Sequence, residues 1–352
     1  MDLHDSRTGE RAVLAVLAGA PIEEVSARLH SSPEHLAEAV KLYCAAGRTA
    51  LNARLSASEW QQVSIEFTDY PTAQRAFLTY LLPSLREACD VGAIGAWWFV
   101  RKFPCWRLRV VHGLQTMGEC ATEPVHDALD SAVSWGVVRR WWPSPYESET
   151  VAFGGTDGMR IAHALFHADS VGVLDYLRAP AAEASVTPDA KATSLIITTL
   201  FLRAAGQEWS EQGDVWARVE AKRPLPDDVP PERVTAMTAT VRKLLTADTT
   251  TALVGGNPLA HLAEWADAIE RGGQTLGNAS REGRLGLGTR GILARHILFH
   301  WNRMGFTTRQ QAIWSRAARE TILGSQPATT RCPQDRPWCM HRSPSATRAS
   351  EP

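Results

Sequence analysis

Two arginines spaced two positions apart give this sequence its clearest chemical feature. In the segment WWFVRKFPCWRLRVV (97–111), Arg107 and Arg109 alternate with apolar residues. Successive side chains of a strand point to opposite faces, so the two arginines share one face and the apolar residues form a core face. Next-but-one side chains lie roughly 6.5 to 7 Å apart, so both guanidinium groups could hold one anionic or carbonyl-rich ligand. The alternative is a pair of solvated or ion-paired arginines on an outer sheet face.

Histidines form a second set of candidates. His163 and His167 are four residues apart, as are His296 and His300, so each pair can share one helix face. Arg303 follows His296 by seven residues, and this His-His-Arg face could line a pocket. The alternative is that these are polar residues on a helix surface. Neither pair has the HExxH form of a zinc protease, so the sequence predicts no metal site there.

Other catalytic signatures are missing from the sequence. It contains no GxSxG elbow, no GxxxxGK[ST] loop and no GxGxxG motif after a strand. The six cysteines are scattered without a CxxC pair, which favours reduced thiols over a disulfide framework or a zinc site. We therefore expect neither a metal nor an organic cofactor.

The elements that must position these residues follow from periodicity. A strand beginning at Trp60, a helix at about 72–90, two strands within 97–111, a helix at about 123–135 and a strand at 137–142 give the order β-α-β-β-α-β. This order is typical of a ferredoxin-like split β-α-β unit. In the second half of the chain, the apolar periodicity and the helix start and stop signals predict helices at about 157–177, 189–206, 209–221, 232–246, 258–277, 289–304 and 307–323. The predicted fold class is α+β with a mainly helical C-terminal half.

Both ends of the chain differ from this body. Residues 10–50 predict three short helices, with Ser32 as an N-cap, so residues 1–55 form a small helical module that resembles a helix-turn-helix. Its third helix has one lysine against two glutamates, which disfavours DNA binding and favours peptide docking or packing. Residues 56–324 form the main domain. Residues 325–352 are rich in Pro, Ser, Thr and Arg without periodicity, and we expect a disordered tail.

Composition restricts the setting in which the protein works. The chain has 352 residues, of which 44% are hydrophobic and 21% charged, with a formal net charge of -1. This balance gives no global argument for nucleic-acid or membrane binding. No apolar run approaches the roughly 18 residues of a membrane span, and the N-terminus lacks signal-peptide order. We expect a cytoplasmic protein without a membrane partner.

Four segments together resemble a known family. They are WWFVRKFPCWRLRV, YESETVAFGG, AHALFHADS and HILFHWNRMG, in that order along residues 60–323. Together they are similar to the thiopeptide-type bacteriocin biosynthesis family, which is related to the C-terminal elimination domain of class I lanthipeptide dehydratases and to thiopeptide pyridine synthases. Each segment alone is a weak signal, and the four in order are fairly specific.

The resemblance implies work on a ribosomally made precursor peptide, with its leader and core. In the dehydratases, a separate domain uses glutamyl-tRNA to glutamylate Ser or Thr, and the elimination domain removes glutamate to leave dehydroalanine or dehydrobutyrine. Pyridine synthases join two dehydroalanines in a formal [4+2] cycloaddition and expel the leader. In both reactions a substrate oxygen gains negative charge, which a cationic strand face would stabilise.

Carried onto this sequence, the resemblance assigns Arg107 and Arg109 to hold the glutamyl carboxylate or a peptide carbonyl. The motifs also imply substrate-binding roles, and the residues concerned are Arg101, Tyr146, Asp169, Ser170 and Arg303. In the family, an arginine stands just before the aromatic residue and the two glycines of the YESETVAFGG segment, and here that position is Ala152. The eliminating histidine of the family corresponds here to Leu298. These departures favour cyclisation over elimination, unless a histidine elsewhere has become the base; the candidates are His163, His296 and His300.

Three hypotheses follow from this sequence. The first is an enzyme that forms a pyridine-type ring on a dehydroamino-acid-bearing precursor and releases the leader. The second is a split dehydratase subunit that eliminates glutamate and works with a separate glutamyl-tRNA-dependent subunit. The third is a non-catalytic partner that docks the precursor through residues 10–50 or a sheet edge.

Overall fold

The computed structural model describes residues 6–113, 122–178, 189–249, 253 and 259–324. The protein is α+β. Four antiparallel strands form one sheet in the order β2-β3-β1-β4, so β3 lies between β1 and β2. The strands are β1 (Trp60–Phe67), β2 (Ile94–Lys102), β3 (Cys105–His112) and β4 (Val138–Ser144). The predicted alternation of strands and helices is present along residues 60–144.

Alternation of side chains gives the sheet two different faces. One face is apolar and packs on the helices that connect the strands, which are α4 (Ala73–Ala76), α5 (Leu82–Asp90) and α6 (Glu123–Ser134). A π-helical turn (Phe77–Leu81) joins α4 to α5 inside the segment predicted as one helix. Its Phe77 stacks on Trp106, which in turn stacks on Phe99 with ring centroids 5.0 Å apart. The opposite face carries Arg107 and Arg109, as the period of two predicted.

Side chains from the helical half cover the outer edge of β2. Within the described part of the chain, strand β2 pairs only with β3, so its other edge has backbone groups that no strand satisfies. The amide of Phe99 donates to Ser170 Oγ (3.3 Å), and the amide of Arg101 donates to Asn302 Oδ1 (2.8 Å). Asn302 Nδ2 donates back to the Arg101 carbonyl (2.7 Å). This edge of the sheet is therefore closed to an added peptide strand.

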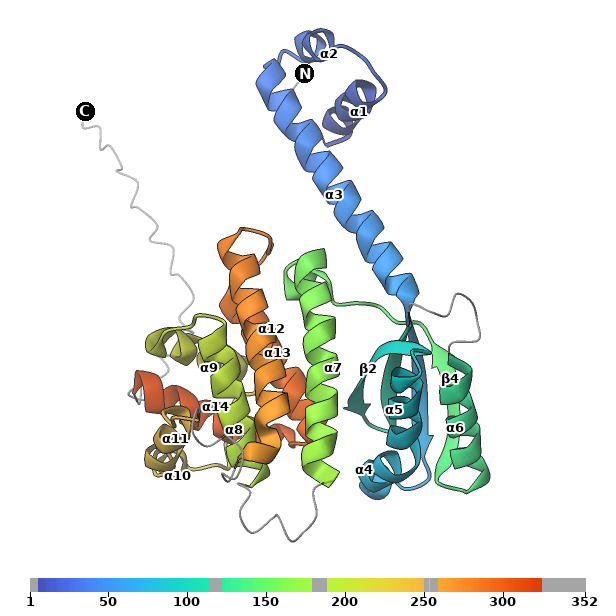
Figure 1. Ribbon diagram of the computed structural model, residues 1–352. Coiled ribbons are helices and arrows are strands. Elements are labelled where there is room, and N and C mark those ends of the chain that lie inside the picture. The colour runs from blue at the N-terminus through green and yellow to red at the C-terminus, as the bar shows by residue number, and fades with distance from the viewer. Residues whose placement is uncertain (1–5, 114–121, 179–188, 250–252, 254–258, 325–352) are drawn as a thin grey trace, which may run out of the picture.

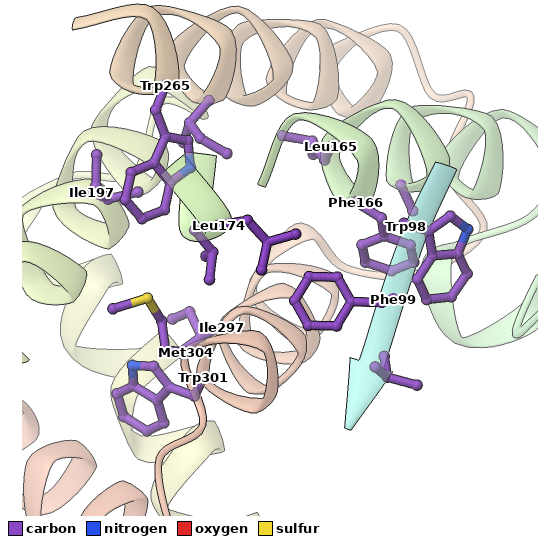
Figure 2. Packing of buried hydrophobic residues seen from close by; sticks show 14 of the residues in the cluster. Trp98, Phe99, Leu165, Phe166, Leu174, Ile197, Trp265, Ile297, Trp301 and Met304 are labelled. Carbon is purple, nitrogen blue, oxygen red and sulfur yellow. The ribbon is translucent and has the colours of Figure 1, made fainter. Parts of the chain in front are cut away.

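The C-terminal half is helical, as predicted. Its longer helices are α7 (Thr156–Arg178), α8 (Ala190–Ala204), α9 (Trp209–Lys222), α12 (Ala263–Arg281), α13 (Thr289–Met304) and α14 (Thr308–Leu323). Figure 1 shows α7 between the sheet and the remaining helices. The core continues across this boundary, because Trp98 of β2 packs on Phe166 of α7 with ring centroids 4.6 Å apart (Figure 2).

Two predicted helices differ from those observed. The helix expected at 232–246 is two short helices, α10 (Pro231–Thr235) and α11 (Thr238–Leu245). Val234, Val241 and Leu245 are all buried, because α10 and α11 both pack against α14 and α11 also packs against α8; their common apolar periodicity therefore does not require one continuous helix. The helix expected at 258–277 begins later, at Ala263, after a 3₁₀ turn.

The N-terminal module contains α1 (Ser6–Leu17), α2 (Ile22–Arg28) and α3 (Pro33–Glu59). Ser32 caps α3 by accepting from the amide of His35 (3.2 Å), as predicted. The third helix is not short, because it continues for 27 residues and leads directly into β1 (Figure 1). A small core of its own holds the three helices together; it contains Ala12, Val13, Val25, Leu29 and Leu36. The predicted disordered tail at 325–352 lies outside the described residues.

No helix among the described residues is long and apolar enough to cross a membrane.

Candidate functional site

A cavity of about 640 Å³ lies between the arginine-bearing sheet face and the helical half. Strands β2 and β3, the segment after β4, and helices α7, α9 and α13 all contribute to its walls. Its lining combines aromatic rings with an excess of cationic groups. The lining residues that matter below are Trp98, Arg101, Lys102, Arg107, Arg109, Tyr146, Glu147, Glu149, Phe153, Phe166, Lys222, Arg223, Arg295, Leu298 and Phe299.

Arg109 is buried in the cavity wall without a hydrogen-bond partner for two of its nitrogens. Its side chain is 7% exposed, and its guanidinium lies 4.0 Å from the centroid of the Trp98 ring and 5.0 Å from that of Tyr146. Its Nε and Nη1 have no partner among the described residues. Burial lowers the pKa of Arg109 to about 10, so it stays cationic at neutral pH. The ring contacts fix a positive group in the cavity wall, and two of its buried donors lack a partner within the described residues.

Tyr146 and His163 form a hydrogen-bonded pair beside Arg109. The Tyr146 hydroxyl lies 2.7 Å from His163 Nε2, and the imidazole packs on Trp60 at 4.6 Å between ring centroids. Burial, aided by the charge of Arg109, lowers the pKa of His163 to about 4. Burial also raises the pKa of Tyr146. Both groups are therefore neutral near pH 7, and the pair can pass a proton to or from a molecule in the cavity.

Arg107 is the second arginine of the strand motif and lies on the same face. It is half-buried and lines the cavity, and no carboxylate of the described residues pairs with it. The register of the sheet places two polar residues of β1 beside the arginines, because Ser64 is opposite Arg107 and Gln62 is opposite Arg109. The interpretation of solvated or ion-paired arginines on an outer face is wrong for Arg109, because that side chain is buried and unpaired.

The structure places three of the predicted site residues, Asp169, His300 and Arg303, in a buried network, and their predicted roles in the site stay predictions. Asp169 of α7 accepts from Arg303 Nε (2.6 Å) and lies 2.9 Å from His300 Nδ1. Burial alone would raise the pKa of Asp169, but the charges of His300 and Arg303 outweigh it and hold that pKa far below its usual range. On the other side of the imidazole, His300 Nε2 lies 2.8 Å from Ser194 Oγ. These residues are not the exposed helix-surface groups of the alternative interpretation.

His296 and Ser170 are also interior residues. The His296 ring lies against Phe153, Phe166 and Phe201, at 5.0 to 5.5 Å between ring centroids, and burial lowers its pKa to about 3. His296 and the Asp169 network border a second, small cavity of about 30 Å³. Ser170 is fully buried, where its Oγ accepts from the edge of β2. A substrate-binding role for Ser170, and a catalytic one for His296, stay predictions.

Arg101 combines a structural contact with a place in the cavity wall. Its Nη2 donates to Gln74 Oε1 (3.0 Å), and its guanidinium lies 4.6 Å from the centroid of the Trp106 ring. Burial lowers the pKa of Arg101 to about 10. Its backbone is held by Asn302, so the whole residue joins β2 to α13 at the cavity.

Several residues of the cavity were not identified from the sequence. Lys222 and Arg223 end α9, more than a hundred residues from the strand motif, and no spacing rule connects the two segments. Glu149 and Arg295 form an ion pair at the wall (2.6 Å), and Glu149 belongs to the YESETVAFGG motif, which offered a signal for it. Trp98 lies opposite Arg109 in the register of the β2-β3 hairpin, and the quoted segment WWFVRKFPCWRLRVV contains both residues, which offered a signal for it. No group of three or more metal-ligating side chains gathers in the described part of the chain.

Comparison with known proteins places this architecture in a family. Residues 60–322 match the family described as lantibiotic biosynthesis dehydratase C-term. No curated protein sequence matches the chain. Among solved structures, the tRNA-dependent lantibiotic dehydratase MibB from Microbispora sp. 107891 is similar at 17% identity with a TM-score of 0.54. The match covers 75% of this chain but only 28% of MibB, so this chain spans less than a third of that dehydratase.

Two smaller proteins are similar over nearly their whole length. TsrL matches at 15% identity over 76% of this chain and 99% of its own, with a TM-score of 0.46. The pyridine synthase TbtD from thiomuracin biosynthesis matches at 14% identity over 75% of this chain and 97% of its own, also with a TM-score of 0.46. Because the family match covers residues 60–322, well over half of the chain, this protein belongs to the lantibiotic biosynthesis dehydratase C-terminal family.

Proposed function

We propose that this protein matures a ribosomally synthesised peptide by forming a pyridine-type ring between two dehydroalanines of the precursor, with release of the leader. The observation that carries the proposal is Arg109, a buried cation without a carboxylate partner in the wall of a cavity large enough for several peptide residues. Tyr146 and His163 stand beside it as an acid–base pair. Family membership supports the choice of a peptide substrate.

Ring formation needs proton transfer at an amide before any carbon bond is made. One dehydroalanine must lose its amide N–H proton and gain a proton on the neighbouring carbonyl oxygen, which gives an azadiene. Arg109 is suited to donate to that oxygen as it gains charge, and the neutral Tyr146–His163 pair is suited to move the proton. Cycloaddition then forms two C–C bonds, one between the β-carbons of the two dehydroalanines and one between the former carbonyl carbon and the α-carbon of the second dehydroalanine. Loss of water and of the leader as an amide leaves the aromatic ring.

Glutamate elimination is the second candidate. A carboxylate held by Arg107 and Arg109 would also fit the unpaired cations of the cavity. This reaction needs a base that removes the α-proton of the glutamylated residue. The resemblance assigns the eliminating histidine to the position of Leu298, which is an apolar part of the cavity wall. Ala152 likewise offers no charge where the family has an arginine. These two side chains favour ring formation. If elimination is the reaction, a separate glutamyl-tRNA-dependent subunit must supply the substrate.

A docking protein without catalysis is the third candidate. One of the two surfaces considered for docking is restricted, because Ser170 and Asn302 occupy the β2 edge of the sheet. The N-terminal module and the β4 edge remain for such a role.

Mass spectrometry of the precursor with purified protein separates the three candidates. The peptide is supplied once with dehydroalanines in place and once with glutamylated serines. Leader release and a dehydrated ring product from the first peptide are the expected result. Loss of glutamate from the second peptide alone would replace ring formation by elimination. Binding of either peptide without any change of mass would favour docking.

A further inference from the structure

The cavity has a strongly basic side that the proposed proton chemistry does not use. We call Lys102, Arg107, Lys222 and Arg223 the basic cluster; all four line the cavity. Arg107 and Lys102 lie on the β2-β3 hairpin, where Lys102 is opposite Cys105, so the two are diagonal neighbours about 7 Å apart. Lys222 and Arg223 enter from the end of α9. The cluster therefore joins two elements that are far apart in sequence.

None of these four charges is neutralised within the described part of the protein. No carboxylate there lies within ion-pairing distance of any of them, whereas many other arginines are paired, such as Arg290 with Glu211 and Arg316 with Glu220. Arg223 is nevertheless held in place, because its Nε donates to Gln311 Oε1 (2.8 Å). The chain as a whole carries a formal charge of -1, so this concentration of positive charge is local. Like charges gathered this way repel one another unless a ligand neutralises them.

We infer that the basic cluster binds the carboxylate side chains of an acidic segment of the precursor peptide, and so holds the reacting residues beside Arg109. The inference rests on the proposed function and names the feature of the peptide that the cavity selects. Arginine and lysine donors on two facing elements can hold two or more carboxylates at once. An extended peptide advances about 3.4 Å per residue, so a segment that enters between α9 and the hairpin reaches Arg109 within a few residues.

A nucleic acid fits this surface less well. Glu147 and Glu149 also line the cavity, and their carboxylates would repel a phosphate backbone that followed the cavity inward. Four cations also form a short patch rather than the long basic stripe that a nucleic-acid backbone requires. Separate carboxylates on a flexible peptide can meet the cluster without approaching these glutamates.

Fluorescence anisotropy with rhodamine-labelled hexaglutamate and hexaglutamine tests the inference on the full chain. We expect hexaglutamate to bind at least tenfold more tightly at 50 mM NaCl and to weaken at 300 mM NaCl. The double variant Lys102→Glu/Lys222→Glu reverses two exposed charges of the cluster, and we expect it to weaken hexaglutamate binding at least tenfold. The matched control Lys41→Glu/Lys243→Glu reverses two exposed lysines outside the cavity and should change binding less than twofold.

Three results would overturn the inference. They are equal binding of the two peptides, equal effects of the two double variants, and tighter binding of a 12-nucleotide RNA than of hexaglutamate. The assay needs no turnover, so it is independent of the reaction. Selective binding without ring formation would contradict the proposed reaction and support the acidic-peptide site. Ring formation with unselective binding would support the reaction and contradict the acidic-peptide site.

Discussion

Two buried arginines, Arg109 in the cavity wall and Arg303 in the helical core, differ in whether a carboxylate of the described residues pairs with them. Arg303 is 1% exposed and donates from Nε to Asp169 at 2.6 Å, and its Nη1 has no partner among the described residues. Arg109 is 7% exposed, contacts Trp98 and Tyr146 through its flat face, and has two nitrogens without partners. Burying a charge without a partner is costly, so a fold that keeps one next to a cavity gains something other than stability. We therefore propose that the paired arginine stabilises the fold and that the unpaired one takes part in the chemistry.

Removal of the carboxylate from the paired network should give the largest loss of stability. In Asp169→Ala, Arg303 becomes a buried charge without its partner, and His300 loses a hydrogen bond. We expect the free energy of unfolding to fall by about 3–5 kcal/mol, which corresponds to a melting temperature about 4–7 °C lower for a chain of this length. Urea unfolding followed by tryptophan fluorescence measures this change. A loss below about 1 kcal/mol would mean that the network does not stabilise the fold.

Removal of the hydroxyl beside the unpaired arginine should affect turnover instead. Tyr146→Phe keeps the ring that packs on Arg109 but removes the oxygen that lies 2.7 Å from His163. We expect ring formation to slow about 100-fold, because general acid–base catalysis typically contributes a factor of this size or more. Single-turnover mass spectrometry of the dehydroalanine peptide gives the rate. An unchanged rate would exclude Tyr146 from the proton transfer.

Acidification should reveal the histidine beside the cavity. The pKa of His163 is about 4 in the folded protein, below its ordinary value of 6.5. Folding therefore favours the neutral imidazole over the charged one. The stability that the neutral His163 contributes is fully present above pH 6.5. As the pH falls from 6.5 towards 4, the free energy of unfolding decreases by up to about 1.4 kcal/mol per pH unit.

The variant His163→Gln should remove this dependence. Unfolding free energies of wild type and variant, measured at half-unit steps from pH 7 to pH 4.5, should converge as the pH falls. Parallel curves would show that His163 does not titrate with folding.

The smallest effect is expected for an exposed ion pair that has the same residue types as the buried pair of Asp169 and Arg303. Asp267 pairs with Arg271 one turn further along α12, and both side chains are more than half exposed. Asp267→Ala should change the free energy of unfolding by less than about 0.5 kcal/mol, because solvent screens such pairs. The same urea experiment measures it, as a control for Asp169→Ala. A loss as large as that of Asp169→Ala would show that burial is not what separates the two pairs.

Sequence reasoning worked where one local rule decides the outcome. The period of two placed Arg107 and Arg109 on one face of β3, and the cap at Ser32 started α3 as expected. The rule could not say which arginine would be buried, because that depends on Trp98 from the neighbouring strand and Tyr146 from a later segment. Local rules fix faces and ends of elements, but not their tertiary neighbours.

The histidine pairs show the same limit. Spacing placed His296 and His300 on one face of α13, but only the packing of α7 and α8 against that face decides that both are buried. The contribution of Lys222 and Arg223 to the cavity depends on how α9 approaches the hairpin, which no short-range pattern encodes. The split of the predicted helix at 232–246 likewise follows from how its two pieces pack.

The measurement that tests the central claim most directly combines rate and stability for one variant, Arg109→Met. Methionine keeps an apolar chain against Trp98 and Tyr146 but removes the charge and the unpaired donors. We expect turnover of the dehydroalanine peptide to fall 100- to 1000-fold, as when one donor to a developing oxyanion is removed. The free energy of unfolding should stay within about 1 kcal/mol of wild type or rise. A marked loss of stability with unchanged turnover per folded molecule would contradict the claim and make Arg109 a structural residue.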